Sequence, residues 1–463
     1  MKIAPVATAT NVQTLYEQSA PRQPQIHLFE TDYGPHAMVA DGSQVYAVAP
    51  ELITELAGLG EAPSAAQVNL LLATSGLASE TSVFMADLNP LTNPPLRALS
   101  LAIAQKCNLG CTYCYAQAGE FGDVAQSMSW EVAKAAVERL FEDTQPGDRV
   151  NLSFMGGEPL INRPLIHRAT QRAMAIAQER HVKVGFGITT NGTLLTVADA
   201  DFFERYGFAV TVSLDGVGAT HDRLRPFKGG GGSYDRILAN LEPLLSRSRQ
   251  MSVSARVTVT PQNLNLRETL QDLIELGFQS VGFSPMLSSP TGKAEMDTAD
   301  LDIMLQQMIE CGQEFERQTL AGRRYPFSNL TMALQQIHRG THRPYPCGAG
   351  AGYMGVSADG NLWACHRFVN DEAGWMGDLD NGLNRDIQNQ WLAARQVDRQ
   401  EPCKSCWARY LCGGGCHHEV IHRGRPACDY IRGWLHFCLR TYVHLLERRP
   451  EYFDSAPAAS VVS

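Results

Sequence analysis

Three cysteines stand close together in the segment Cys107-Asn-Leu-Gly-Cys111-Thr-Tyr-Cys114. Three thiolates can hold a 4Fe–4S cluster and leave one iron without a protein ligand. A structural zinc ion normally takes four protein ligands, and no fourth ligand lies nearby in the sequence. We therefore predict an iron–sulfur cluster with one open iron, and the alternatives are a structural zinc site or three buried cysteines.

Most of the other cysteines gather toward the C-terminal end of the chain. Of twelve cysteines in 463 residues, eight lie between positions 347 and 438, and Cys311 stands alone in an apolar helical pattern. Cytosolic thiols stay reduced, so clustered cysteines favour metal ligands over disulfides. We expect Cys311 to be a buried apolar residue. The eight C-terminal cysteines are Cys347, Cys365, Cys403, Cys406, Cys412, Cys416, Cys428 and Cys438.

The composition argues against several classes of protein. The chain has 39 basic and 48 acidic residues, a net charge of −9, and no basic face, which predicts no nucleic-acid partner. No apolar run reaches about 18 residues, so we expect no membrane-spanning helix and no membrane partner. The N-terminus lacks the apolar core of a secretion signal. We therefore expect a cytoplasmic protein.

Between positions 97 and 290, strand-like and helical segments alternate. Six such steps predict a parallel sheet covered by helices, which is an α/β fold built as a partial (β/α)6 TIM barrel. The active site of such a barrel lies at the C-terminal ends of its strands. The strands are expected near 98–104, 149–155, 183–190, 208–214, 252–259 and 280–286.

Polar motifs follow these strands in order. The run Gly156-Gly157-Glu158-Pro159 follows the second strand; its glycines allow close backbone approach to a ligand, and Glu158 can accept from an ammonium group. Asn191 follows the third strand, Ser213 and Asp215 end the fourth, and Arg256 lies in the fifth. Each motif alone is also compatible with an ordinary turn. Together they predict one polar site at the strand ends.

The cysteine triplet and these motifs resemble the radical S-adenosylmethionine superfamily. The resemblance implies that the open iron binds the amino and carboxylate groups of S-adenosylmethionine, whose cleavage gives a 5′-deoxyadenosyl radical. It also implies that Tyr113 lies against the adenine and that Gly156-Gly157-Glu158-Pro159 contacts the methionine amino group. Asn191, Ser213 and Arg256 are then expected to hold the ribose and the carboxylate.

The C-terminal cysteine pattern resembles the SPASM extension of radical enzymes that modify peptides. The resemblance implies two auxiliary 4Fe–4S clusters, three clusters in all. It assigns Cys347, Cys365 and Cys416 to the first auxiliary cluster. It assigns four cysteines to the second auxiliary cluster, and it favours Cys428 over Cys438 as the last of these ligands. The remaining ligands of this second cluster are Cys403, Cys406 and Cys412.

The chain departs from this family near Cys347, because a further cysteine that some relatives have a few residues later is missing. The first auxiliary cluster then has either an open iron able to bind a substrate thiolate or a non-cysteine ligand such as His366 or His417. Cys438 lies in an apolar helix, where a core position is the simpler interpretation.

Extra clusters favour a net oxidation, since a carbon radical that forms a new bond must lose one more electron. The segments around Cys365 and Cys416, with the ending Tyr430-Ile-Arg-Gly-Trp-Leu435, resemble thioether-forming maturases such as those of quinohemoprotein amine dehydrogenase. Related enzymes make carbon–carbon cyclophane rings. The resemblance implies a precursor peptide or small protein as substrate and an electron donor such as flavodoxin or ferredoxin.

Two other functions are compatible with the sequence. One is oxidation of a Cys or Ser to formylglycine, as in sulfatase maturation; His366 stands where that group has an aspartate, which argues against it. The other is a non-catalytic iron–sulfur peptide chaperone, which the intact triplet and Gly156-Gly157-Glu158-Pro159 motif disfavour. For proton removal, Asp215 is the candidate general base, with a turn residue as the alternative; His366 is a weaker candidate.

In the N-terminal part of the chain, the strands expected within 28–48 can bind the leader of a precursor peptide by strand addition, or they form a cap that stabilises the barrel.

The motifs divide the chain into five parts. The parts are an N-terminal arm and α+β module (1–92), the barrel (93–296), a bridging helical segment (297–340), the SPASM domain (341–445) and a disordered tail (446–463).

Overall fold

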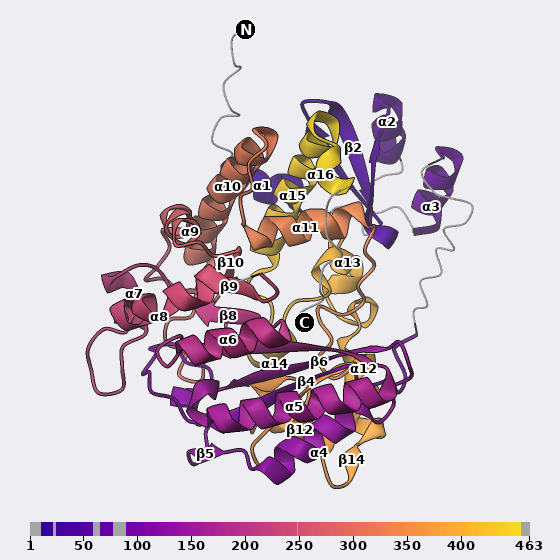
Figure 1. Cartoon of the computed structure of the whole chain (residues 1–463). Helices are drawn as coiled ribbons and strands as arrows, with labels where there is room; N and C mark the ends of the chain where they lie inside the picture. Colours follow the sequence, from indigo (N-terminus) through magenta and orange to yellow (C-terminus); the bar gives the residue numbers. More distant parts are fainter. Residues whose placement is uncertain (1–10, 22–24, 59–64, 77–88, 248, 455–463) are drawn as a thin grey trace.

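The structure is a computed structural model of the chain (Figure 1). None of the helices it describes is long and apolar enough to cross a membrane. It describes all residues except 1–10, 22–24, 59–64, 77–88, 248 and 455–463.

Six parallel strands form the centre of the molecule and confirm the predicted α/β fold. Their order in the sheet follows the order of the chain, from β4 at one side to β10 at the other. A helix lies in each connection, which is the usual way to join parallel neighbours. The strands are β4 (Ala98–Gln105), β6 (Arg149–Gly156), β7 (Lys183–Thr190), β8 (Ala209–Ser213), β9 (Ser252–Val259) and β10 (Ser280–Pro285).

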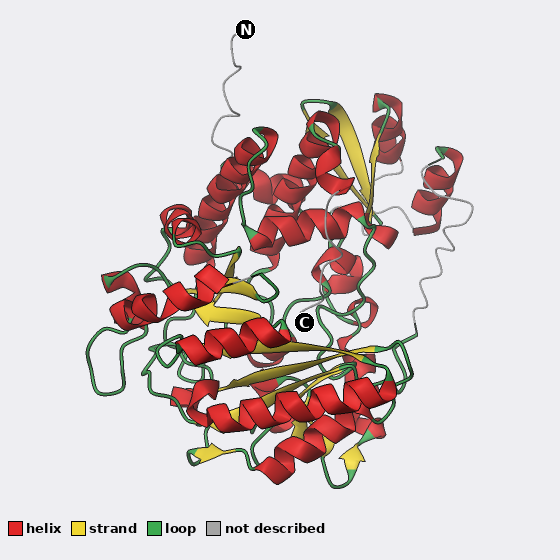
Figure 2. Cartoon of the chain, viewed as in Figure 1, coloured by secondary structure: helices red, strands yellow, loops and turns green. Residues whose placement is uncertain are grey.

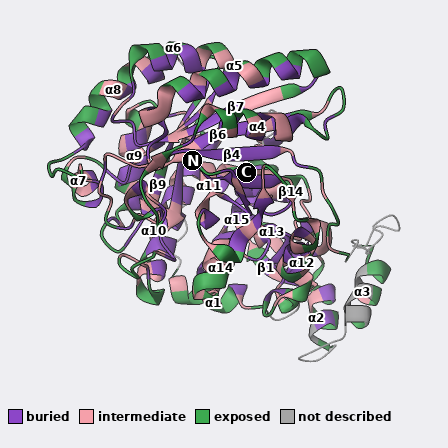
Figure 3. Cartoon of the chain, turned by 90° about the horizontal axis from the view of Figure 1, so that it is seen from below, coloured by how far each residue is buried: buried purple, intermediate pink, exposed green. Residues whose placement is uncertain are grey.

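The connecting helices form a layer over one face of this sheet (Figure 2). Their inner faces are buried, and their outer faces are exposed (Figure 3). Helix α4 begins at an N-cap, Ser129, whose hydroxyl accepts from the Val132 N–H at 3.2 Å. The helices are α4 (Trp130–Phe141), α5 (Arg163–Arg180), α6 (Val197–Tyr206), α7 (Ala219–Leu224), α8 (Tyr234–Arg247) and α9 (Leu266–Glu275).

The two faces of the parallel sheet differ in chemistry. On β6, the residues facing the helices are Val150, Leu152 and Phe154, all fully buried, and on β9 the buried positions are again apolar. The alternate positions are small or polar and only partly buried, such as Ser153 and Ser254. Since side chains alternate between the faces of a strand, the concave face is lined by polar and small groups. This lining leaves room for a ligand where a closed barrel would have an apolar core.

The cysteine-rich region adds strands to the same sheet, which the sequence analysis does not anticipate. Strand β11 pairs in parallel with β4, and β12 to β14 continue the sheet as antiparallel neighbours. The region is therefore joined to the barrel by a backbone ladder as well as by side chains. The added strands are β11 (Tyr353–Val356), β12 (Asn361–Trp363), β13 (Trp375–Asp378) and β14 (Gly382–Leu383), and β5 (Gln126–Ser127) pairs with β4 at its end.

Helices surround the short C-terminal strands. Helix α15 carries Cys438 at a fully buried position, while Cys311 is fully buried in α10, the longest of these helices. The predicted core positions of these two cysteines are confirmed. The helices are α10 (Thr298–Leu320), α11 (Ser328–His338), α12 (Arg385–Arg395), α13 (Arg409–Cys412), α14 (His417–Arg423), α15 (Cys428–Arg448) and α16 (Glu451–Asp454).

The N-terminal part contains an antiparallel sheet in the order β1-β2-β3, with a tight turn at Asp41–Ser43. Within the predicted N-terminal arm, α1 forms a helix that packs on α15 and buries Leu15. Figure 1 shows this indigo segment beside the yellow C-terminal helix. The elements are α1 (Val12–Ser19), β1 (Ile26–Thr31), β2 (Gly34–Val39), β3 (Gln44–Ala47), α2 (Pro50–Gly58) and α3 (Ala65–Thr74).

The predicted disordered tail also needs correction at its start. Helix α15 continues to Arg448 and α16 follows it, because Phe453 is buried and stacks on His338 at 4.6 Å between ring centroids. The rest of the predicted tail, 455–463, lies outside the described residues.

Candidate functional site

The first cysteine group lies in a loop directly after β4. Backbone hydrogen bonds from Gly110 to Pro226 and from Thr112 to Leu224, at 2.8 and 3.0 Å, fix this loop to the segment after α7. Burial raises the pKa of Cys111 to about 12, and the neighbouring Cys114 and Cys107 thiols add to this rise. The structure thus brings the three predicted ligands together on one fixed loop. Thiols clustered in this way suit a metal cluster, which binds them as thiolates.

Glycines make room for this loop against the next strand. A Cβ placed on Gly157 would lie 2.3 Å from the Lys106 carbonyl oxygen, and one on Gly119 would lie 2.8 Å from the Cβ of Cys107. Gly156 has φ +139°, a conformation that L side chains rarely adopt. Larger residues at these positions would push the cysteine loop away from the end of β6. The glycines therefore let the cysteine loop lie directly against the end of β6.

Glu158 is fully buried at the end of β6. Its carboxylate accepts from the Asn191 N–H at 2.7 Å, the Thr190 hydroxyl at 2.8 Å and the Leu160 N–H at 3.0 Å. Burial raises its pKa, and these hydrogen bonds oppose the rise. The side chain thus connects the end of β6 to the end of β7. Its neighbour Pro159 begins the following 3-10 turn.

Asn191 reaches the cysteine loop from β7. Its amide nitrogen donates to Asn108 at 2.9 Å and lies 3.7 Å from the Cys107 sulfur, while its oxygen accepts from the Thr193 hydroxyl at 2.6 Å. Two predicted site residues, Glu158 and Asn191, are therefore adjacent, and their positions are mutually fixed.

Tyr113 and Asp215 lie in a buried network with Arg225. The Tyr113 hydroxyl donates to Asp215 and accepts from Arg225 at 2.5 Å, and the Arg225–Asp215 ion pair spans 3.4 Å. The other Asp215 oxygen accepts from the Thr258 N–H at 2.8 Å. Burial raises the pKa of Asp215, and Arg225 opposes this rise. Both carboxylate oxygens are thus occupied by internal donors, and a general-base role for Asp215 stays a prediction.

Ser213 and Arg256 are neighbours in the ladder between β8 and β9. Both lie on the polar concave face of the sheet, where the Arg256 guanidinium donates to Ser284. The Arg256 side chain is open to solvent, yet protein surrounds it enough that burial lowers its pKa, with Glu419 opposing. Arg256 is therefore a cation on the concave face whose charge is influenced by Glu419 of the cysteine-rich region. Sequence reasoning did not identify Arg225, which stands in a charged run with no motif to mark it.

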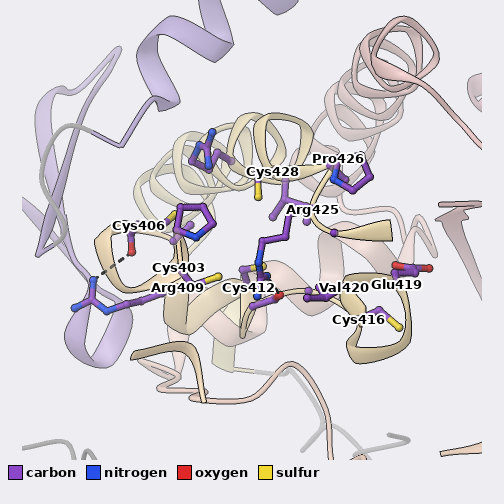
Figure 4. A pocket seen from close by; sticks show the side chains of 18 of the residues that line it. Cys403, Cys406, Arg409, Cys412, Cys416, Glu419, Val420, Arg425, Pro426 and Cys428 are labelled. Atoms are coloured by element: carbon purple, nitrogen blue, oxygen red, sulfur yellow. Dashed lines mark hydrogen bonds between the residues drawn. The ribbon is translucent and has the colours of Figure 1, made fainter. Parts of the chain in front are cut away.

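Five cysteines of the C-terminal region line one pocket of about 80 Å³, and four of them are the residues predicted for the second auxiliary cluster (Figure 4). Burial raises the pKa of Cys403 to about 11, with Arg425 opposing and the neighbouring thiols adding to the rise. Figure 4 shows Cys416 at the edge of the pocket near Glu419. Cys438 lies elsewhere, in the core of α15. The four cysteines of this second auxiliary group are Cys403, Cys406, Cys412 and Cys428.

A further group contains Cys347, Cys365 and Cys416. Burial raises the pKa of Cys365 to about 12, and the Cys416 and Cys347 thiols contribute to this rise. Cys347 itself is exposed. The structure thus brings together the three residues predicted for the first auxiliary cluster, and we call them the first auxiliary group.

The two histidines considered as further ligands differ in their contacts. The His366 Nδ1 lies 2.8 Å from the Tyr353 hydroxyl, which lies 2.8 Å from that of Ser100. His417 is buried, and its Nε2 has no hydrogen-bond partner within the described part of the chain. Burial lowers the pKa of both imidazoles to about 4. A ligand role for either histidine stays a prediction.

Arg367 lies between the cysteine loop after β4 and the first auxiliary group. Its guanidinium lies 5.5 Å from the centre of the Tyr115 ring and 3.7 Å from the Cys416 sulfur, and it pairs with Glu419 at 2.7 Å. Tyr115 directly follows Cys114. Burial raises the pKa of the Tyr115 hydroxyl, and the nearby thiols of Cys114 and Cys365 add to this rise. One side chain therefore contacts both cysteine regions.

Beside Arg367 lies a cavity of about 380 Å³. Its walls come from the loop after Cys114, the loop after β10 and the cysteine-rich region. Asp371, His418 and His422 line it, and their potential ligand atoms lie within 4.8 Å of one another. Sequence reasoning did not identify this trio. The i,i+4 spacing of the histidines is a signal, but Asp371 is brought beside them only by the fold.

Comparison with known proteins finds similarity to one family in part of the chain. Residues 101–273 match the Radical SAM superfamily. The chain is 25% identical over 353 residues to a serine-type anaerobic sulfatase-maturating enzyme of Klebsiella aerogenes, covering 74% of this chain and 85% of that protein. It is 23% identical over 362 residues to the radical SAM cyclopropyl synthase TigE of Paramaledivibacter caminithermalis, covering 74% and 73% of the two chains.

Solved structures agree on the fold. The structure of native anSMEcpe with bound AdoMet superposes with a TM-score of 0.63 at 19% identity, covering 77% of this chain and 100% of that one. The first cysteine group and the polar strand ends thus lie within the segment that matches the Radical SAM superfamily, on a fold shared with this solved structure.

Proposed function

We propose that this chain, which matches the Radical SAM superfamily over residues 101–273, is a radical S-adenosylmethionine maturase that installs an oxidative cross-link within a precursor peptide or small protein. A thioether between a cysteine sulfur and a carbon is the favoured product, with a carbon–carbon ring as its variant. Relatives named as sulfatase-maturating enzymes and as a cyclopropyl synthase support a peptide or protein substrate.

The observation that carries this proposal is the arrangement of three cysteine groups along one path. The groups are those after β4, the first auxiliary group beside Arg367, and the four cysteines of the second pocket. Cross-linking removes two hydrogens from the substrate, and one electron must leave after the first hydrogen atom is taken. The cysteine groups that lie beyond the first one would hold clusters that offer that electron an acceptor.

The residues present fit the cofactors of this reaction. Cys107, Cys111 and Cys114 would hold the first cluster, and the first auxiliary group and the second pocket would hold two more. When bound, the clusters and S-adenosylmethionine supply a 5′-deoxyadenosyl radical and sites that accept an electron. Tyr113, Asn191, Ser213 and Arg256 would hold S-adenosylmethionine beside them, together with Gly156-Gly157-Glu158-Pro159.

The chain's own side chains prepare this site in two ways. Arg225 and Asp215 hold the Tyr113 ring by its hydroxyl, so the ring keeps one orientation at the strand ends. Arg367 places a positive charge beside the Cys416 sulfur, which stabilises a thiolate and the negative charge of anything that thiolate binds. Asp215 would accept a proton only after Tyr113 or Arg225 moves, and His366 has fewer internal partners.

The small N-terminal sheet is proposed to bind the leader of the substrate by strand addition. The sheet is joined to the cysteine-rich region, since the His27 ring stacks on Trp407 at 3.9 Å and Trp407 follows Cys406. A peptide held at this sheet would therefore be tethered to the part of the chain that lines the cavity.

Oxidation of a Cys or Ser to formylglycine is the second candidate. The sulfatase-maturating relatives favour it, as they cover most of both chains. His366 directly after Cys365, in place of the aspartate of that group, favours the cross-link.

Mass spectrometry of a candidate peptide, co-expressed with the enzyme under anaerobic conditions, tests the proposal. The peptides are those encoded beside this gene. We expect a loss of two hydrogens together with loss of one thiol that reacts with iodoacetamide. The same mass loss with all thiols retained would indicate a carbon–carbon ring. A product that reacts with a hydrazide probe would instead establish formylglycine, and unmodified peptide with no 5′-deoxyadenosine would contradict both.

A further inference from the structure

The trio Asp371, His418 and His422 has the composition of a metal site, although it lies outside all three cysteine groups. His418 and His422 are four residues apart in α14, so their rings lie on the same face of the helix. The ring centroids are 4.6 Å apart. Asp371 precedes a short 3-10 turn and approaches this face from the β12–β13 connection.

One oxygen of Asp371 is directed at both histidines. Its Oδ1 caps the turn by accepting from the Ala373 N–H at 3.1 Å, which fixes the carboxylate. Its Oδ2 lies 2.6 Å from the His422 Nε2 and 3.9 Å from the His418 Nε2. Two ligands of a tetrahedral zinc ion, with bonds of about 2.0 Å, are roughly 3.3 Å apart. The two observed separations fall on either side of that value.

The neighbouring residues hold the trio in place but leave one of its nitrogen atoms without a hydrogen-bond partner among the described residues. Phe368 is fully buried and packs against both imidazole rings, at 5.0 and 6.4 Å between centroids. The Nδ1 of His418 is buried and has no hydrogen-bond partner among the described residues. The two arginines beside the trio are already paired, Arg367 with Glu419 at 2.7 Å and Arg423 with Glu295 at 3.2 Å. Their charge is thereby offset, so the trio retains its own carboxylate for a cation.

We propose that Asp371, His418 and His422 bind a divalent transition-metal ion such as Zn²⁺ in the wall of the 380 Å³ cavity. Two imidazoles and one carboxylate are a ligand set that zinc and ferrous ions share, and three protein ligands leave at least one position open. The open position faces the cavity, because all three residues line it. If the proposed peptide substrate enters this cavity, which rests on the function proposed above, its thiolate or carboxylate becomes the natural fourth ligand.

Zinc binding to the full chain, with its clusters reconstituted and no peptide present, tests the site independently of the enzyme's function. The protein is equilibrated with Zn²⁺ under anaerobic conditions and desalted, and zinc and iron are measured together. We expect about one zinc per chain, held by nitrogen and oxygen at about 2.0 Å in zinc X-ray absorption. Sulfur neighbours at about 2.3 Å would mean that zinc occupies cysteine positions and would overturn the proposal.

Two variants locate the ion. Asp371→Asn keeps the shape of the side chain, and His422→Ala changes a residue whose side chain is 38% exposed, so both should fold and keep their iron. Each should lower zinc affinity by about 100-fold or more, beyond the 10–100-fold that loss of an outer partner costs. His444→Ala is the matched control, because His444 pairs with Glu316 at 3.2 Å in the helical region, and it should bind zinc normally. Unchanged zinc content in both trio variants would show that Asp371 and the histidines form an ordinary ion pair.

Discussion

The barrel half and the cysteine-rich half of the site are built in different ways. At the strand ends of the barrel, the buried polar side chains Glu158, Asn191 and Asp215 all have internal hydrogen-bond partners. In the cysteine-rich half, His417 and His418 each have a buried ring nitrogen without a partner in the described part of the chain. Buried polar groups are normally paired, so these two histidines lack partners that Glu158, Asn191 and Asp215 already have.

This difference indicates that the two halves depend on bound metal clusters to different degrees. The barrel half is held by strand pairing and by the hydrogen bonds of Glu158, Asn191 and Asp215 at the strand ends. The other half has short strands and helices, such as the four-residue α13, around pockets lined by thiols. Small regions of this kind gain much of their folding free energy from metal binding. Strand β11, paired with β4, is the element through which one half supports the other.

Removing each set of cysteines tests the comparison most strongly. Replacing Cys107, Cys111 and Cys114 with Ala should abolish formation of 5′-deoxyadenosine and lower iron from about twelve to about eight per chain, because one of three 4Fe–4S clusters is lost. The fold should remain, since the barrel half does not need its cluster. Iron analysis and limited proteolysis of anaerobically purified protein measure both effects.

The matched variant replaces Cys403, Cys406 and Cys412 with Ala. Here we expect the region after residue 341 to become susceptible to protease while fragments of the barrel persist. Equal protection of both halves in the two variants would show that the cysteine-rich half folds without its clusters. About four irons in the unchanged protein would contradict the assignment of auxiliary clusters altogether.

Substituting one carboxylate in each half should give the next largest difference, which is a difference in unfolding free energy. Asp215→Asn removes the charge that offsets buried Arg225, and loss of one partner of such a pair costs about 3 kcal/mol or more of unfolding free energy. Asp371→Asn affects a half-exposed pair and should cost about 0.5 kcal/mol. Denaturant unfolding of the two variants under anaerobic conditions measures the difference. A small loss of unfolding free energy for Asp215→Asn would mean that Asp215 is only weakly held by Tyr113 and Arg225. Asp215 would then be a better candidate for the general base.

The same contrast explains what the sequence reveals. The six β/α steps follow from alternating apolar strands and amphipathic helices, and the cysteine ligands follow from spacing, because both signals are local. Arg225 carries no such signal, since its partners Tyr113 and Asp215 meet it only in the folded chain. Asp371 is similar, because topology alone brings it to His418. The pairing of β11 with β4 is also invisible locally, as a four-residue strand gives too short a pattern to assign.

The last prediction concerns the contact between the N-terminal sheet and the cysteine-rich half. His436 in α15 is buried, with its Nδ1 3.0 Å from the His27 Nε2, and burial together with Arg440 lowers its pKa to about 4. An unfolded histidine has a pKa of about 6.5, so between these values the unfolded state binds more protons. Stability from this contact is therefore complete above pH 6.5 and is lost as the pH falls toward 4.

At pH 5.5 the expected loss is about 1.4 kcal/mol relative to pH 7.5, since one pH unit below the unfolded pKa corresponds to about 1.36 kcal/mol. Hydrogen exchange of β1 amides should speed up accordingly, while that of β7 in the barrel should not. His436→Phe removes the titrating group and should make β1 exchange independent of this proton. If β1 and β7 respond alike, or if the Phe variant keeps the pH dependence, the acid sensitivity belongs to the whole fold. The N-terminal sheet would then be attached to the cysteine-rich half by its apolar contacts, such as the stacking of His27 on Trp407, and protonation of His436 would have no part in it.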